Sequence, residues 1–263
     1  MRHSSLFGPD SMMWRISRES VMLFGGRAAV LMQLAHPLVA AGVAAHSDYR
    51  SDPYKRLRRT LDTMYTIVFE SAEDARDAVA RVNDVHDHVK GVAGDGRKYS
   101  ALDPHLQLWV HTTLVYSSIK VYERFIEPLT PDELERYYQE SKVIGSLFGI
   151  PGELHPETYE ELVSWMWHLM DTGEVQVTDL ARELADPIVR PLSLVPRGLS
   201  RGTSLITPGL LPRPIREGYG FTVGASRAAV MAIGGRAARL VLPRLPQSVR
   251  THPAARNAER RTA

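Results

Sequence analysis

The stretch Asp103-Pro-His-Leu-Gln-Leu-Trp-Val-His-Thr-Thr-Leu114 decides the fold class, because it combines a helix start with helical periodicity. Asp103 belongs to the residue types that cap helix N-termini, and Pro104 suits the first helical position. Apolar residues then recur at the three- and four-residue spacing of a helix that buries one face, namely Leu106, Trp109, Val110 and Leu114. The stretch therefore predicts a helix over residues 104–126.

Similar helix starts recur along the chain. Thr130-Pro-Asp-Glu133 is a capping box, in which the glutamate reaches back to the amide of the cap residue. Asp52-Pro53 and Asp186-Pro187 repeat the pairing of a capping residue with proline, and Ser71 precedes a further start. Sustained alternation of period two is absent, so the sequence predicts an all-α fold. The expected helices span residues 18–47 with a bend near His36-Pro37, 53–69, 72–90, 104–126, 131–149, 156–171, 176–185 and 215–241.

A proline-rich segment interrupts the helices between residues 187 and 214. It holds six prolines, and interspersed leucine and isoleucine favour an irregular wrap over the body rather than a flexible linker. The wrap leads into the C-terminal helix. We expect a single helical domain over residues 14–250 and a disordered tail over 251–263, which is short, polar and rich in alanine and arginine.

The composition bounds the chemistry. The chain has 263 residues, of which 44% are hydrophobic, and this suffices for one sizeable core. Its 32 Lys and Arg nearly balance 30 Asp and Glu, which argues against a nucleic-acid partner. The lack of cysteine excludes disulfides, thiolate metal sites, iron–sulfur clusters and cysteine nucleophiles. Any chemistry must therefore rest largely on histidine and arginine.

One segment needs comparison with a membrane span. Residues 28–45 are 18 residues without a charge, at the lower limit for crossing a bilayer. They contain Gln33, His36 and Pro37 and are rich in alanine and glycine, which favours a buried core helix and leaves membrane association as the weaker alternative. The first eleven residues lack the apolar core of a signal peptide, and we expect a cytoplasmic location.

Arg56, Arg59 and Thr60 share one stripe of the helix expected over 53–69, because residues three and four apart are neighbours on a helix. The simplest interpretation is a solvated basic face, since further basic residues crowd the same turn. The functional alternative is that Arg56 and Thr60 turn inward and hold a polar ligand in an apolar cavity.

Several histidines lie on apolar segments. His86 has apolar neighbours that favour an inward position, whereas His88 points to nearly the opposite side of the helix, so the two cannot chelate one metal. His36 precedes the proline at the expected bend, and His111 lies in the most apolar part of its helix. Each is interpretable as a hydrogen-bonded core residue or as a ligand to a metal or cofactor.

Common catalytic signatures are missing. The chain contains no His-Glu-x-x-His, no Gly-x-Ser-x-Gly and no phosphate-binding Gly-x-x-x-x-Gly-Lys sequence. The glycines at 218, 220 and 224 do not have the dinucleotide-binding spacing, and Gly91 to Gly96 is expected to be a loop. These absences argue against zinc proteases, serine hydrolases and nucleotide-binding enzymes of the common types.

Taken in order, these motifs resemble the domain-of-unknown-function family 2236, which is grouped with the MpaB oxygenase and the catalytic domain of the rubber oxygenase latex-clearing protein. The resemblance covers roughly residues 14–250. It is carried by Gly25-Gly-Arg-Ala-Ala-Val-Leu-Met-Gln-Leu-Ala-His-Pro37, His46-Ser-Asp-Tyr49, Arg56-Leu-x-x-Thr60, Arg81-Val-x-x-Val-His86, Tyr99-Ser-Ala-Leu-Asp-Pro104 and Trp109-Val-His111.

The resemblance implies an all-helical core with globin-like features that holds haem b and its iron. His86 matches the axial metal ligand of the rubber oxygenase. Arg56, Arg59 and Thr60 match its distal arginine, lysine and threonine, and Arg59 keeps the positive charge of lysine with a different donor geometry. A catalytic glutamate of that enzyme has no evident counterpart here, and neither has its secretion signal.

The leading hypothesis is therefore a haem-b-dependent oxygenase that brings O2 to an apolar, isoprenoid- or lipid-like small molecule. Its catalytic residues would be Arg56, Arg59 and Thr60, and its cofactor-binding residues His86, His36 and His111. A haem or lipid sensor or carrier without turnover is the first alternative. A non-haem metal site of His36, His86 and His111 and a cofactor-free helical interaction protein are the others. The sequence leaves the substrate and the oligomeric state open.

Overall fold

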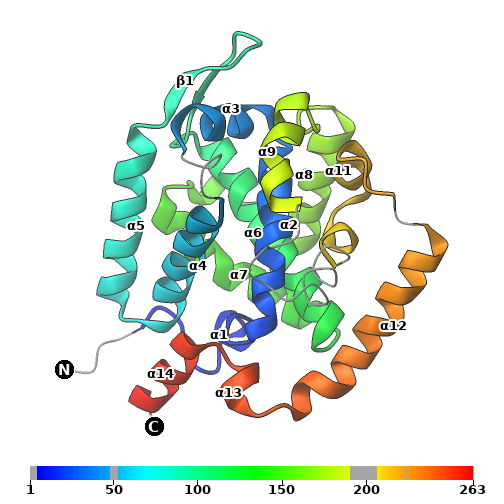
Figure 1. Cartoon of the computed structure of the whole chain (residues 1–263). Helices are drawn as coiled ribbons and strands as arrows, with labels where there is room; N and C mark the ends of the chain where they lie inside the picture. Colours follow the sequence, from blue (N-terminus) through cyan, green and yellow to red (C-terminus); the bar gives the residue numbers. More distant parts are fainter. Residues whose placement is uncertain (1–4, 48–52, 190–205, 223, 263) are drawn as a thin grey trace.

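The computed structural model describes residues 5–47, 53–189, 206–222 and 224–262, and helices build most of this described part (Figure 1). The two short strands β1 (Lys90–Val92) and β2 (Lys98–Ser100) pair antiparallel as one hairpin. The predicted all-α fold class is therefore confirmed.

Helix α6 (Pro104–Phe125) runs through the middle of the molecule (Figure 1). The side chain of Asp103 accepts hydrogen bonds from the amides of His105 and Leu106, so the helix begins where the capping sequence predicts. Trp109 and Ile119 on this helix are fully buried. Polar side chains on α6 must consequently find their partners inside the protein.

Helix α2 (Leu23–Leu34) packs directly on α6, and Gly25 permits the close approach. A Cβ atom at this position would lie 3.3 Å from Cγ2 of Val121 and 3.5 Å from the carbonyl oxygen of Ser117. A larger side chain would force the two helices apart.

The chain turns by 104° between α2 and α3 (Pro37–His46), which confirms the predicted bend. His36 caps α3, because its Nδ1 atom accepts a hydrogen bond of 3.2 Å from the amide of Leu38. In the described residues no single helix has both the length and the apolar composition of a membrane span, whereas Ser20–Leu34 and Pro37–His46 meet these two criteria as a bent pair.

Other helices pack around this pair. Helices α7 (Pro131–Phe148) and α8 (Tyr159–Asp171) contact α6, and α4 (Pro53–Phe69) contacts α2 and α5 (Ala72–Asp87). The predicted capping box at Thr130 is formed, and Ser71 caps α5 as expected. Near the N-terminus, the short elements α1 (Met12–Ser17) and η1 (Ser20–Met22) begin the helical part earlier than residue 18.

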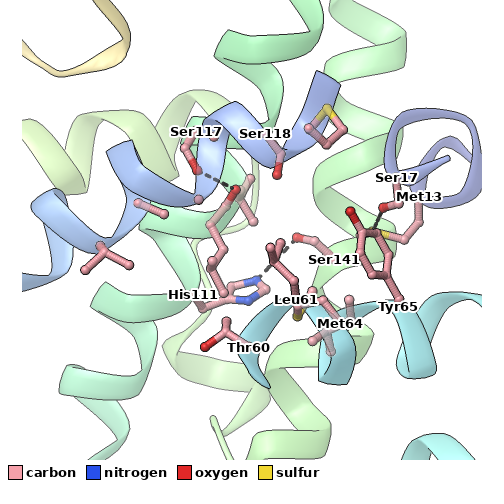
Figure 2. Close-up of a pocket in the computed structure, with 18 of the residues that line it drawn as sticks. Met13, Ser17, Thr60, Leu61, Met64, Tyr65, His111, Ser117, Ser118 and Ser141 are labelled. Carbon is pink, nitrogen blue, oxygen red and sulfur yellow. Dashed lines mark hydrogen bonds between the residues drawn. The ribbon is translucent and has the colours of Figure 1, made fainter. Parts of the chain in front are cut away.

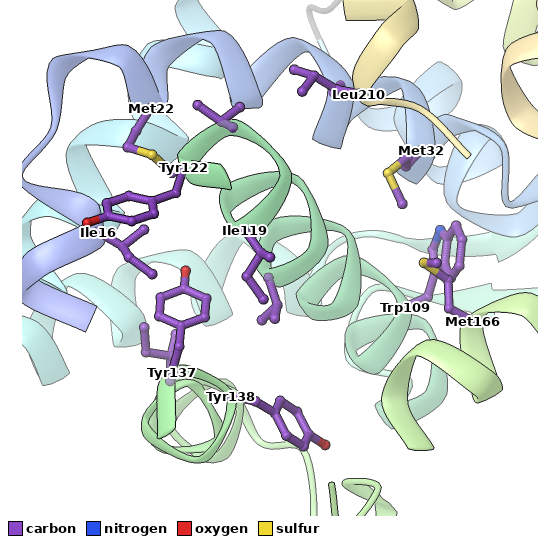
Figure 3. Close-up of a cluster of buried hydrophobic side chains, with 14 of the residues drawn as sticks. Ile16, Met22, Met32, Trp109, Ile119, Tyr122, Tyr137, Tyr138, Met166 and Leu210 are labelled. Carbon is purple, nitrogen blue, oxygen red and sulfur yellow. The ribbon is translucent and has the colours of Figure 1, made fainter. Parts of the chain in front are cut away.

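The core fills the space around α6 (Figure 3). Aromatic and thioether side chains contribute much of its volume, and Tyr138 and Met166 have no exposed surface. The largest fully buried side chains are Trp109, Tyr122, Tyr138, Met13, Ile16, Leu31, Met32, Leu34, Ile67, Leu108 and Ile119. These residues come from helices distant in sequence, so they join the helical domain into one packed core.

Two expectations for residues 176–214 require correction. Pro187 does not start a helix but lies inside α9 (Asp179–Val189), where Leu184 and Ile188 are buried. Proline here removes one hydrogen bond near the helix end, and the buried apolar side chains outweigh that loss. Of the proline-rich wrap, residues 190–205 lie outside the described part, and residues 206–210 are helical.

The C-terminal region also differs from its prediction. The helix expected over 215–241 is divided into α11 (Arg213–Gly218) and α12 (Ala225–Val241), with Gly220 between them at a φ of 74°. Helix α14 (Pro253–Thr262) replaces the expected disordered tail. It packs on α4 through the buried residues Ala255 and Ala258, whose small side chains let the helix lie flat.

The glycine-rich segment after α5 forms the hairpin instead of the expected loop. Helix α5 ends at Asp87 rather than at residue 90. Gly91 faces the ring of Tyr99, and a Cβ atom there would lie only 2.7 Å from the Tyr99 hydroxyl oxygen. Glycine is therefore required for the strands to pair in this register.

A buried ion pair ties α13 (Gln247–Arg250) to η1 and generates a stability prediction. Glu19 is only 3% exposed, and its carboxylate accepts hydrogen bonds of 2.9 Å from both Nε and Nη2 of Arg250. We expect Arg250→Ala to lower the free energy of unfolding by about 1–3 kcal/mol, because it leaves a buried carboxylate unpaired. Urea unfolding measures the change. Arg213→Ala, which removes a pair on the surface, is the control and should match the wild type; equal losses in both variants would contradict the assignment.

Candidate functional site

A cavity of about 90 Å³ lies where α2, α4, α6 and α7 meet, and residues of α1 and η1 complete its lining (Figure 2). Four helices from separate parts of the chain supply most of its walls. The lining residues are Met13, Ser17, Met22, Gly25, Gly26, Ala29, Val30, Gln33, Thr60, Leu61, Met64, Tyr65, His111, Leu114, Val115, Ser117, Ser118, Tyr137, Ser141 and Ile144.

No charged side chain occurs among these lining residues. Their polar groups are hydroxyls, the amide of Gln33 and one imidazole, that of His111. The side-chain amide of Gln33 donates a hydrogen bond of 3.2 Å to the hydroxyl of Thr113, which is not one of the lining residues. The cavity is therefore a neutral, mainly apolar space that presents a few hydrogen-bonding atoms.

His111 is the polar centre of the site. Its side chain is buried, and Nε2 lies 3.3 Å from the hydroxyl oxygen of Ser141. That hydroxyl donates its proton to the carbonyl oxygen of Tyr138 at 2.7 Å, so the remaining interaction is donation from Nε2–H of His111 to Ser141. His111 is therefore the tautomer that carries its proton on Nε2 and a lone pair on Nδ1.

The pKa of His111 is lowered to about 3, first by burial and then by the neighbouring His155. The imidazole is therefore uncharged at neutral pH. An uncharged imidazole with one nitrogen held by a hydroxyl is the form in which histidine accepts a proton or ligates a metal.

His155 is a residue that the sequence analysis did not single out. Its ring lies 5.7 Å from that of His111, centroid to centroid, and meets it edge to face at 85°. Both ring nitrogens of His155 are buried and have no hydrogen-bond partner in the described part of the protein. Burial also lowers the pKa of His155, so two neutral imidazoles lie together beside the cavity.

The loop that carries His155 is fastened to α7. The hydroxyl of Tyr138 donates to the carbonyl oxygen of Pro156 at 2.7 Å, and Nζ of Lys142 donates to that of Glu157 at 2.9 Å. Gly145 makes room for the imidazole, because a Cβ atom there would lie 2.4 Å from Cε1 of His155. A signal was available in the sequence, since His155-Pro156 repeats the His-Pro pair found at residue 36.

Of the predicted catalytic residues, the structure brings Thr60 to the cavity. Thr60 and His111 both line it, and Figure 2 labels the two side chains. Arg59, the next residue along the helix, is exposed. Arg56 lies one turn earlier in α4, and its side chain falls outside the described part. The proposed stripe therefore divides, with the threonine inside and Arg59 on the surface.

The other predicted ligands lie apart from the cavity lining. His86 is half-buried near the end of α5, and His36 is buried next to Trp109, with 6.4 Å between ring centroids. The pKa of His36 is lowered to about 4 by burial, so its contact of 3.9 Å with Glu174 is not an ion pair at neutral pH. Within the described residues, no three His, Asp or Glu side chains gather as a metal site, so His36, His86 and His111 do not form one there.

Tyr65 contributes one of the hydroxyls in the lining of the cavity. Its hydroxyl is buried without a hydrogen-bond partner among the described residues, and burial raises its pKa to about 12. The ring is held in place by stacking on His252 at 3.8 Å between centroids. A protonated phenol is thus available to a ligand in the cavity.

The low pKa of His111 makes stability depend on pH. The unfolded chain binds this proton with a pKa near the ordinary 6.5, whereas the folded chain binds it near 3. Between these values the unfolded state holds more protons, so the free energy of unfolding falls as the pH decreases from 6.5 toward 3, by about 1.4 kcal/mol per unit for one such group. Urea unfolding at neutral and mildly acidic pH should show a shallower slope for His111→Gln. His105→Gln is the control, because His105 is exposed on the same helix, and it should keep the wild-type slope. A wild-type slope in His111→Gln would show that His111 is not the source of the pH dependence.

The chain is similar to one protein family and to two curated mycobacterial proteins. The family described as ER-bound oxygenase mpaB/B'/Rubber oxygenase, catalytic domain, matches residues 14–241. "Uncharacterized protein Mb2261" of Mycobacterium bovis and "Uncharacterized protein Rv2237" of Mycobacterium tuberculosis are each 31% identical to the chain over 134 residues, 49% of this chain and 52% of each relative. The chain thus spans about half the length of these curated relatives, and no solved structure gives a significant match. The resemblance inferred from the motifs is confirmed: this chain belongs to the oxygenase family that contains the mpaB enzymes and the catalytic domain of rubber oxygenase.

Proposed function

We propose that this protein is a haem-b-dependent oxygenase that brings O2 to an apolar small molecule. Membership of the family supports oxygenase-type chemistry. The observation that carries the proposal is that Thr60 and His111 line one cavity, so that a hydroxyl and a neutral imidazole both belong to a lining that is otherwise mainly apolar.

The hydrogen-bonding and ligating groups of this region suit a haem, but the cavity is too small to hold one. A neutral imidazole is the usual protein ligand of haem iron, and no carboxylate in the described lining competes with it. The cavity of about 90 Å³ is nevertheless far below the roughly 300–1,000 Å³ of sites for organic ligands and cofactors. A haem would therefore require a larger cavity than the one described here.

His86 and His111 are the two candidate iron ligands. The resemblance to rubber oxygenase favours His86, and burial beside the cavity favours His111. Bound haem iron would supply the binding and activation of O2. Arg56 and Arg59 are proposed, through the family resemblance alone, as the basic residues of the distal side.

The remaining roles follow from the residues that line the cavity. The hydroxyl of Thr60 can donate a hydrogen bond to an oxygen atom held in the cavity that His111 also lines, and most of the surrounding wall is apolar. Methionines at 13, 22 and 64 give those walls flexible side chains that can repack around a larger occupant. An isoprenoid or lipid chain suits such walls better than a charged substrate does.

A haem or lipid carrier without turnover is the second candidate. The observation that favours it is the absence of aspartate and glutamate from the described lining, because the resemblance implies a glutamate base for the rubber oxygenase reaction. Haem binding without oxygen consumption would identify this alternative.

The cofactor proposal is tested by the absorption spectrum of protein purified from haem-replete cells. We expect a Soret band in the wild type, and its loss or shift in whichever of His86→Ala and His111→Ala removes the iron ligand. His105→Ala, at an exposed histidine, should leave the spectrum unchanged. A wild type that shows no Soret band after reconstitution with haem would refute haem dependence.

The role of Thr60 is tested by oxygen uptake in the presence of isoprenoid substrates. Thr60→Val keeps the shape of the side chain and removes the hydroxyl, so we expect the rate to fall roughly tenfold, as for one lost hydrogen bond of about 1.4 kcal/mol. Thr66→Val is the matched control on the same helix, since the Thr66 hydroxyl bonds to the carbonyl oxygen of Asp62. Equal rates in both variants would exclude Thr60 from the reaction.

A further inference from the structure

The segment that contains α12 and α13 has an unusual charge pattern. Residues 218–258 contain no aspartate or glutamate and six arginines, at positions 227, 236, 239, 244, 250 and 256. The whole chain, in contrast, nearly balances its charges. An uninterrupted basic segment of this kind is attracted to negatively charged surfaces.

The same segment exposes large apolar side chains. Ile233, Leu240 and Val241 on α12 are 65%, 64% and 55% exposed, and Val249 on α13 is 59% exposed. Ile233 and Leu240 are seven residues apart and therefore lie on one face of the helix, with Val241 next to them. Arg236 and Arg244, both exposed, flank this face. We call the surface formed by Ile233, Arg236, Leu240 and Val241 of α12, together with Arg244 of the following 3-10 turn η4 (Leu242–Arg244), the outer face of α12.

Packing explains why this face is directed outward. Gly235 is buried against Arg124 of α6, where a Cβ atom would lie 2.9 Å from Cδ of the arginine. Arg239 donates to the carbonyl oxygen of Glu123, also on α6. The inner side of α12 is thus fixed to the body, and Figure 1 shows the helix along the edge of the molecule.

Two of the arginines are therefore part of the fold rather than of the surface. Arg239 turns toward α6, and Arg250 pairs with the buried Glu19. By their spacing, Arg227, Arg236 and Arg239 do not share one face of a helix. An arginine that points into the body need not lie on the face that contacts a partner, so this spacing does not exclude α12 as a contact surface.

We propose that the outer face of α12, continued by Val249, docks on a membrane surface rich in anionic phospholipid. Apolar side chains of a helix that lies in the membrane plane insert at the boundary of headgroups and acyl chains, and flanking arginines bind lipid phosphate. Helix α12 has 17 residues and is about 25 Å long, so its apolar and basic groups can engage the surface together. The complementarity of charge favours lipid over a second copy of this chain, which would bring the same arginines together.

The test uses the fact that the chain has no cysteine. Leu240→Cys introduces a single thiol on the outer face, and Val85→Cys introduces one at a site on α5 that is 63% exposed, as a matched control. Each is labelled with an environment-sensitive fluorophore and mixed with vesicles of phosphatidylcholine alone or of phosphatidylcholine and phosphatidylserine in equal parts. We expect a blue shift and brightening only for the label at 240, only with phosphatidylserine, and weakened by added salt.

Charge reversal provides the second arm. Arg236→Glu combined with Arg244→Glu should reduce co-sedimentation with the phosphatidylserine vesicles at least tenfold, whereas Arg76→Glu on α5 should leave it unchanged. Circular dichroism checks that each variant is folded.

No spectral change of the label at position 240 with either kind of vesicle would overturn the proposal. So would light scattering that shows a dimer disrupted by Leu240→Ser, because the face would then bind a second copy. The readout needs neither haem nor turnover, so failure of the proposed oxygenase reaction would leave it intact.

Discussion

The close packing of α2 on α6 is the constraint on which the rest of the structure depends. A Cβ atom at Gly25 would lie only 3.3 Å from Cγ2 of Val121, so a side chain at this position would have to displace Val121 or the neighbouring helix by a few tenths of an ångström. Because both helices are largely buried, their polar side chains pair inside the protein, as Gln33 does with Thr113. The cavity lies along this contact, since Gly26 and Ala29 contribute too little volume to fill the space that α4 and α7 enclose.

The polar groups in the described lining of the cavity are uncharged, and the buried carboxylate of Glu19, which pairs with Arg250, is not part of that lining. His111 and His155 both have lowered pKa values, Ser141 links the first of them to α7, and the described lining of the cavity carries no charge. In such surroundings a hydrogen bond is stronger than in water, and an unpaired charge is costly. A neutral, apolar molecule with one or two oxygen atoms is the kind of ligand that this interior tolerates.

Local signals explain how much of the fold the sequence could predict. Asp103 and Thr130 cap their helices with their own side chains, so the start of α6 and of α7 can be read from a few residues. Pro187 inside α9 and the helix α14 depend instead on contacts with distant residues, which a local pattern does not contain. The same distinction applies to Gly91, because its need for glycine comes from the ring of Tyr99 on the opposite strand.

The candidate site divides in the same way. Thr60 and His111 carried signals in the sequence, but which of several histidines meets the threonine depends on how α4 and α6 pack. His155 lies in a loop without periodicity, and only its fastening to α7 directs it toward His111. The arginines of α12 show the converse case. Arg239 bonds to the carbonyl oxygen of Glu123 in the body, whereas Arg236 is exposed. The spacing of the arginines in the sequence does not tell these two positions apart, because the difference comes from how α12 packs on α6.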